Sequence, residues 1–179
     1  MDADRFWFRP GVVGGLRAAG LVVVAPDRDT TPSSWAVAAD VVAVGLQAST
    51  SVVAGSNGVS VAVRLALQHR PLVDRLLLLW PATCGDPTVD AATPAAASHL
   101  LAGDTLRGVT DDEIVGLDVP MAVMASDPAN RFHAQQTVDR LLELIPRATR
   151  IATGFPESPR PEFDAVCGAF ITTVVPYLR

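Results

Sequence analysis

The sequence predicts an α/β fold in which a mostly parallel sheet carries helices on both faces. Short apolar runs rich in leucine or β-branched residues alternate along the chain with longer segments of helical periodicity. These runs contain few polar positions, as is typical of strands buried on both faces of a parallel sheet. The chain has 179 residues, of which 49% are hydrophobic, so we expect one domain over residues 1–179.

Five segments have the composition of buried strands: Leu21–Ala25, Ser51–Ala54, Arg75–Trp80, Met121–Ala125 and Ala148–Ile151. We therefore expect a sheet of about five strands. A glycine-flanked turn and a strongly apolar helix follow Val52–Ala54, which favours a central position for that strand.

Helical segments separate these strands: Pro10–Ala19, Ser33–Leu46, Ser56–His69, His133–Ile145 and Pro161 to about Val175. The fourth has Val138, Leu141, Leu142 and Ile145 on a single face, the pattern of an amphipathic helix. The last begins with Pro161, followed by Glu162 and Asp164 in its first turn, which matches the preferences of helix N-termini.

The stretch from about residue 81 to 118 is longer than an ordinary connection and is rich in Ala, Thr, Gly and Asp. Its Ala-rich part, Ala91–Ala102, has helical composition. We expect a short cap-like excursion over the edge where the strands end.

Composition excludes several classes of function. All fourteen basic residues are arginine, so a lysine Schiff base and a P-loop lysine are excluded. A net charge of −5 without a basic run favours neither nucleic acid nor a membrane as partner. Two cysteines and three histidines suggest no disulfide framework or metal site. We expect no cofactor.

Neither a signal peptide nor an apolar run of membrane-spanning length is evident, so a cytoplasmic location is expected.

The turn Gly55-Ser56-Asn57-Gly58 joins a predicted strand directly to a predicted helix. One interpretation is a nucleophile elbow, in which small neighbours allow a sharp turn and the helix N-terminus favours developing negative charge on a substrate. The other is a strand-to-helix loop with Ser56 as the helix N-cap.

The longer stretch GSNGVSVAVRLALQHRPLVDRLLLLWPAT resembles the elbow helix and following strand of the α/β-hydrolase superfamily. Ala54–Gly58 occupies the small-x-Ser-x-Gly turn, with alanine in place of the usual first glycine. After this turn, the sequence also matches the family pattern at Arg64-Leu65-Ala66, His69, Val73 and Leu76. Upstream, residues 16–28 look like the helix and strand that precede the elbow. Downstream, residues 119–124 and 141–151 look like the late strand, helix and strand.

The resemblance implies that Ser56 is the nucleophile and that the amide of Asn57 is an oxyanion donor. Two features depart from the family. The chain lacks the family's first strands and the loop that supplies a second oxyanion donor. In the family, a histidine usually follows the last strand. At that place this sequence has Gly154-Phe155-Pro156-Glu157, without a histidine.

His133 is the candidate base, because it follows the strand Met121–Ala125 on the loop where the family keeps its catalytic acid. Loops at strand carboxyl ends open on one face, so Ser56 and His133 should share it. Asp127 or Asn130 could orient the imidazole. The alternative is an exposed histidine at a helix start. Glu157 could serve as an unusual base or belong to a rigid proline loop.

Other polar side chains also follow strands on that face. Asp27 and Thr83 are candidate pocket residues. Cys84 resembles a second nucleophile, but without a basic neighbour an inert thiol is the competing interpretation. His69 is interpreted as a capping or surface residue. His99 is interpreted as a loop residue.

These observations predict a serine hydrolase that cleaves carboxylic esters, with Ser56 as nucleophile, His133 as base, Asp127 as orienting acid and Asn57 as oxyanion donor. One alternative is a non-catalytic α/β-hydrolase-like protein that binds a ligand or a partner. Another is a fragment whose catalytic completeness depends on missing N-terminal residues. The expected ligand is a small-molecule ester or an apolar compound. A homo-oligomer is also expected, because the absent strands should expose a sheet edge.

Overall fold

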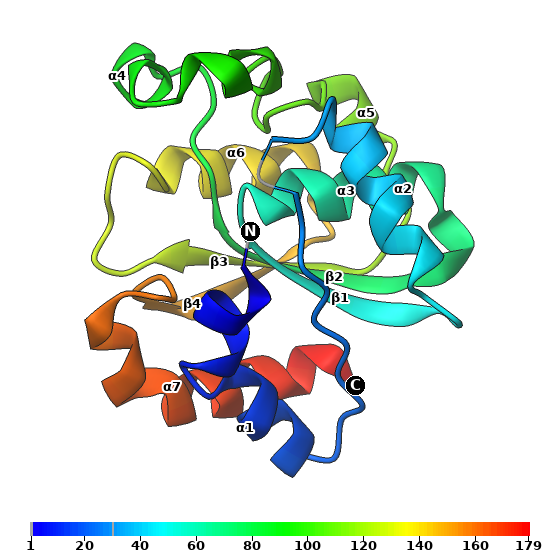
Figure 1. Cartoon of the computed structure of the whole chain (residues 1–179), viewed down its shortest axis with the longest axis vertical. Coiled ribbons are helices and arrows are strands. Elements are labelled where there is room, and N and C mark those ends of the chain that lie inside the picture. Colours follow the sequence, from blue (N-terminus) through cyan, green and yellow to red (C-terminus); the bar gives the residue numbers. More distant parts are fainter. Residues whose placement is uncertain (1, 30) are drawn as a thin grey trace.

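A computed structural model describes residues 2–29 and 31–179, which form a four-stranded sheet covered by helices on both faces (Figure 1). The strands are β1 (Thr50–Ser56), β2 (Val73–Pro81), β3 (Met121–Ser126) and β4 (Thr149–Phe155). They lie in chain order and every neighbouring pair is parallel. The predicted fold class, a parallel sheet between two helical layers, is confirmed.

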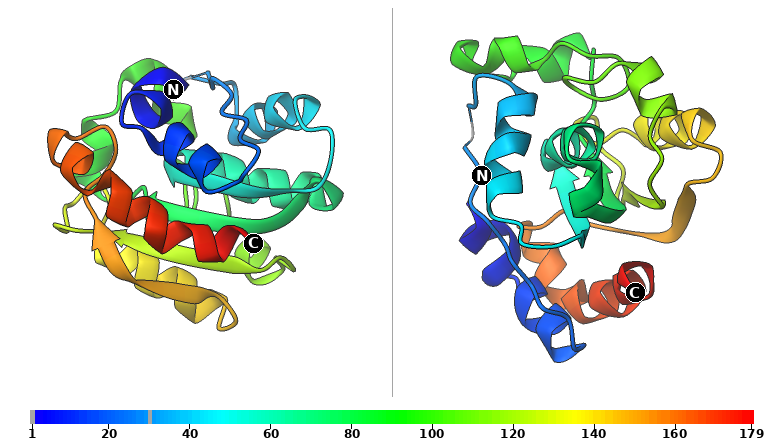
Figure 2. Two further views of the ribbon diagram at one scale, coloured as in Figure 1. Left: turned by 90° about the horizontal axis from the view of Figure 1, so that it is seen from below. Right: turned by 90° about the vertical axis from the view of Figure 1, so that its right-hand side faces the viewer.

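Five longer helices form the two layers, and each lies within the segment predicted for it. One face carries α2 (Trp35–Val44), α3 (Gly58–Gln68) and α6 (Gln135–Leu144), and the other carries α1 (Val12–Ala18) and α7 (Pro161–Val174) (Figure 2). Short helical turns complete the described chain: Asp4–Phe8, Arg70–Leu72, α4 (Pro87–Ala91), Ala95–Leu100, α5 (Asp111–Val115) and Val175–Leu178. Within the described residues, no helix has the length and apolar character needed to cross a membrane.

Strand β2 forms the middle of the core because its side chains alternate between the two helical layers. Leu76 and Leu78 belong to the cluster beneath α2, α3 and α6, whereas Leu77 and Leu79 belong to the cluster beneath α1 and α7. All four are at most 1% exposed. A continuous leucine run is stable here because both faces of the strand are covered.

Segment 82–120 packs on the layer of α2, α3 and α6. Its apolar side chains Leu100, Leu106, Val109 and Ile114 join that cluster. The indole of Trp35 in α2 donates a hydrogen bond of 2.9 Å to the carbonyl of Leu100. Helix α4 ends at Ala91 and a separate turn begins at Ala95, since Pro94 interrupts the Ala-rich stretch.

Residues 21–25 depart from the prediction. The segment is not a strand, and Val22 and Val24 are 99% and 67% exposed. Consequently β1 lies at one edge of the sheet, and the prediction that Val52–Ala54 is central was wrong. The physical reason is that a cleft, lined by both segments, separates residues 21–25 from β1, so the two cannot exchange main-chain hydrogen bonds.

An aromatic cluster fixes α7 against the sheet. Phe163 and Phe170 of α7 are fully buried, with ring centroids 6.0 and 5.9 Å from that of Trp80 at the end of β2. Phe155 at the end of β4 meets Phe170 edge-on at 5.6 Å. Such pairs add to the free energy gained by burying the rings.

We predict that Phe163→Ala lowers the free energy of unfolding by about 3–5 kcal/mol, because it leaves a cavity against Trp80 and Phe170. Phe8→Ala is the matched control, since Phe8 is 44% exposed. Urea titration monitored by circular dichroism measures both variants. Equal losses for the two would contradict the assignment of Phe163 to the core.

Candidate functional site

Ser56 stands at the carboxyl end of β1 in a backbone conformation that few side chains adopt. Its φ is 54°, in the left-handed region, and α3 begins two residues later at Gly58. A Cβ at Gly55 would lie 3.2 Å from the ring of Trp80, so only glycine fits comfortably before the serine. The sharp turn expected of a nucleophile elbow is therefore present.

The hydroxyl of Ser56 faces His133, which lies on the loop after β3. Ser56 Oγ and His133 Nε2 are 2.9 Å apart, although the residues are 77 positions apart in sequence. The His133 side chain is 14% exposed. The structure thus brings together the two residues that the sequence indicated as nucleophile and base. The alternative placing of His133, as an exposed side chain, does not fit this burial.

The carboxylate that meets the other imidazole nitrogen belongs to Glu157, not to Asp127. Glu157 Oε1 lies 2.9 Å from His133 Nδ1, and the Glu157 side chain is 7% exposed. Asp127 is exposed, and its backbone N–H donates to the carbonyl of Phe155 at 3.1 Å. Asp127 does not orient the imidazole in this arrangement because its main chain is tied to β4 and its side chain lies in solvent.

These contacts determine the tautomer of His133. An ionised carboxylate only accepts hydrogen bonds, so Nδ1 must carry the proton that points at Glu157. Nε2 is then the unprotonated nitrogen and accepts the hydrogen bond from the Ser56 hydroxyl.

Glu157 stays ionised although it is buried. Burial by itself would raise its pKa, but hydrogen bonds from His133, Ser126 and Asn130 outweigh burial and lower the pKa to about 2. Ser126 Oγ lies 2.6 Å from Oε1, and the Asn130 side-chain amide donates to the same oxygen. Arg160 forms an ion pair with the other oxygen, Oε2, which accepts no hydrogen bond.

Two residues of neighbouring loops hold the main chain around His133. Asn130 Oδ1 accepts hydrogen bonds from the backbone N–H groups of Phe132 and His133, at 3.0 and 3.2 Å. Thr83, after β2, accepts one from the N–H of Ala134 at 2.9 Å and donates its own N–H to the carbonyl of Phe132. Thr83, predicted as a pocket residue, therefore supports the histidine loop.

Asn57 is the last residue before α3, so its N–H is among the amides that a helix leaves unpaired at its N-terminus. Its side chain makes no capping bond. Instead Asn57 Oδ1 accepts a hydrogen bond of 3.2 Å from Arg107, whose side chain is 7% exposed and also pairs with Asp90 at 3.3 Å. The interpretation of Ser56 as the N-cap was wrong, because Asn57 occupies that position.

The remaining candidates have partners outside this group. Asp27 accepts the N–H of Ala3 at 2.8 Å, His69 contacts Asp40, and His99 contacts the carbonyl of Pro32. Burial raises the pKa of the Cys84 thiol despite the nearby positive charge of Arg107, which disfavours a nucleophilic thiolate. Within residues 2–29 and 31–179, no three acidic, histidine or cysteine side chains form a group that could hold a metal ion.

Sequence reasoning missed Ser126 and Arg107. Ser126 ends the otherwise apolar strand β3, and a polar residue at the carboxyl end of a parallel strand is a usable signal. Arg107 lies in the cap-like segment, where the sequence pattern does not indicate which side chains turn inward.

Solved structures resemble most of the chain, whereas sequence comparisons find nothing. No protein-family model matches, and no curated protein matches either. BpoC of Mycobacterium tuberculosis H37Rv has a TM-score of 0.74 at 12% identity, covering 95% of this chain and 85% of its own. The meta-cleavage product hydrolase CumD of Pseudomonas fluorescens IP01 gives 0.67 at 16% identity, with 99% and 87% covered. A thermophilic esterase of Thermogutta terrifontis gives 0.61 at 14%, with 86% and 78% covered. Identities this low establish the fold alone.

We predict that Glu157 makes stability depend on pH in acid. Its pKa is lower in the folded state than its usual 4.5, so its stabilising contribution is present above about pH 5 and is lost as the pH falls toward 2. Between pH 5.5 and 3, the free energy of unfolding should fall by about 2 kcal/mol more in the native protein than in Glu157→Gln.

Urea titrations at the two pH values measure this difference. The control is Asp127→Asn, which removes an exposed carboxylate and should follow the native protein. An identical pH dependence in Glu157→Gln and in the native protein would contradict the ionised, hydrogen-bonded state of Glu157.

Proposed function

From the α/β-hydrolase fold of this chain, taken as the premise, we propose that the protein is a serine hydrolase that cleaves carboxylic esters. The observation that carries the proposal is the continuous relay from Ser56 Oγ through His133 to Glu157, with 2.9 Å at each contact. A nucleophile, a base and an orienting carboxylate in this order are the parts that acyl transfer needs.

In the proposed reaction, Ser56 Oγ attacks the ester carbonyl carbon while His133 Nε2 takes the hydroxyl proton. The negative charge that develops on the carbonyl oxygen is stabilised by the N–H of Asn57 at the start of α3. When the intermediate collapses, the C–O bond to the alcohol breaks and His133 gives its proton to the departing oxygen. Glu157 stays ionised throughout and stabilises the imidazolium.

A water molecule then attacks the acyl group on Ser56, and His133 accepts the water proton. The C–O bond to Ser56 breaks, the proton returns to Ser56 Oγ, and the carboxylic acid leaves. The net reaction consumes one water and yields an acid and an alcohol, with no cofactor in either step.

Only one oxyanion donor, the amide of Asn57, is assigned here. Deleting one of two donors costs about 3 kcal/mol of transition-state stabilisation in other serine hydrolases. We therefore expect slow turnover and a preference for short, activated esters over amides, because a good leaving group needs less stabilisation.

The competing function is binding without catalysis, and it is favoured by the large apolar cleft beside β1. A fluorophosphonate reagent distinguishes the two, because it forms a stable covalent bond only with an activated serine. Labelling that maps to Ser56 supports the hydrolase. The absence of labelling, in a protein shown to be folded, supports the binding protein.

We predict that Ser56→Ala and His133→Ala each lower kcat for p-nitrophenyl acetate at least about 10³-fold and that the double variant is little worse, because the two residues act as one unit. His99→Ala should retain native turnover, since His99 contacts Pro32 instead. Native turnover in His133→Ala would show that His133 is not the base.

A second prediction separates the two carboxylates. Glu157→Gln should lower kcat about 10²–10⁴-fold, because the amide no longer holds the imidazole in the required tautomer. Asp127→Asn should leave kcat within about twofold. The reverse result, with the larger loss in Asp127→Asn, would return the orienting role to Asp127.

A further inference from the structure

Arg107 is a buried arginine of the cap-like segment that the proposed reaction does not use. Its side chain is 7% exposed and contacts Asn57 Oδ1 at 3.2 Å and Asp90 Oδ1 at 3.3 Å. Its Nε is buried and has no hydrogen-bond partner among the described residues. A buried ion pair adds little net stability, and an unpaired buried N–H costs free energy. The stability of the fold therefore does not by itself explain an arginine at this position.

The loop that carries Arg107 is fixed against α2 and α3. Gly108 has a φ of 71°, and a Cβ there would lie 2.0 Å from the indole of Trp35, so the loop packs on α2 without room for a side chain. Arg64 of α3 donates from Nε to the carbonyl of Gly108 at 2.7 Å and pairs with Glu113 at 2.6 Å. Helix α3 thus holds the residue next to Arg107, while Arg107 reaches the residue that precedes α3.

Asn57 depends on this contact because its side chain does not cap α3. The backbone of Asn57 is helical, with φ −59° and ψ −17°, whereas an asparagine normally caps a helix from an extended conformation. The hydrogen bond from Arg107 holds the Asn57 side chain instead. Asn57 follows Ser56, whose φ of 54° lies in the left-handed region that few side chains adopt. A partner that fixes Asn57 therefore also fixes the peptide group between these two residues, which carries the N–H assigned to the oxyanion.

We propose that Arg107 is a positioning residue, which holds Asn57 so that its N–H points at the oxyanion that forms on the ester carbonyl. This inference rests on the proposed hydrolase function. The carbonyl oxygen gains its charge only during the attack by Ser56, so the contribution of Arg107 is made in the transition state. Direct binding of an anionic substrate by Arg107 fits less well, because the carboxylate of Asp90 already balances its charge.

The test is a double-mutant cycle in the full chain, with p-nitrophenyl acetate as substrate. Arg107→Met and Asn57→Ala should each lower kcat about tenfold and change KM less than about twofold, because the N–H remains but loses its fixed orientation. The double variant should be at most about twofold slower than either single variant, since the two side chains act through one hydrogen bond. Arg107→Lys, which keeps a charged donor, should retain kcat within about threefold of the native value.

Arg150→Met is the matched control. Arg150 also pairs with an aspartate, Asp139, but it lies near the amino end of β4, whereas Ser56 stands at the carboxyl end of β1. This variant should keep the native kcat. Urea titration checks that every variant folds. If Arg107→Met does not fold, the same substitution is combined with Asp90→Asn, which removes the carboxylate that would be left unpaired.

Three results would overturn the proposal, and they are distinguishable. Additive losses in the double variant would show that Arg107 acts on the substrate directly rather than through Asn57. Native kcat in Arg107→Met, in a protein that turns over the ester, would remove the role of Arg107 and leave the hydrolase function intact. The absence of both turnover and fluorophosphonate labelling in the folded native protein would overturn the hydrolase function and this inference with it.

Discussion

The candidate site depends on the hydrogen bonds that the buried carboxylate of Glu157 accepts. Its Oε1 accepts hydrogen bonds from His133, Ser126 and Asn130, which come from the end of β3 and the loop after it, while Glu157 itself follows β4. One acceptor thus joins two loops and sets the tautomer of the imidazole that faces Ser56. Without it, nothing in the described structure would hold His133 Nε2 as an acceptor.

Hydrogen bonds in the core hold together the strand ends from which these two loops start. The indole N–H of Trp80 donates to the carbonyl of Phe155 at 2.9 Å, and the N–H of Asp127 donates to the same carbonyl at 3.1 Å. This carbonyl connects the carboxyl ends of β2, β3 and β4. The ring of Trp80 also lies against Gly55, so the same side chain that anchors α7 limits the turn that presents Ser56.

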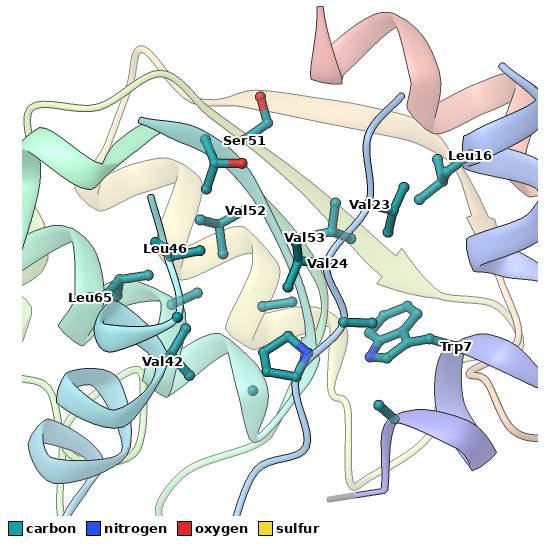
Figure 3. Close-up of a pocket in the computed structure, with 18 of the residues that line it drawn as sticks. Trp7, Leu16, Val23, Val24, Val42, Leu46, Ser51, Val52, Val53 and Leu65 are labelled. Carbon is teal, nitrogen blue, oxygen red and sulfur yellow. The ribbon is translucent and has the colours of Figure 1, made fainter. Parts of the chain in front are cut away.

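The sheet has two edge strands, β1 and β4. Strands β2 and β3 have partners on both sides, whereas β1, which carries Ser56, and β4 each have one partner among the described strands. Ser56 therefore stands at the end of an edge strand whose free side lines the cleft (Figure 3). The sequence resembles a family pattern in which a carboxylate follows the late strand and a histidine follows the last strand. In this structure His133 lies after β3 and Glu157 lies after β4.

The sequence by itself determined the elements and two members of the site. Short, mostly apolar runs identified β1 to β4, although the same pattern also predicted a strand at residues 21–25 that is absent. Helical periodicity identified the five longer helices, and local turn composition pointed to Ser56. Position after a strand pointed to His133. Only the tertiary structure decided that Glu157 rather than Asp127 meets the imidazole, and that β1 lies at an edge, since residues 21–25 form no strand. Local patterns report which segments become strands or helices. The choice of strand neighbour and of hydrogen-bond partner depends on contacts between segments far apart in the chain.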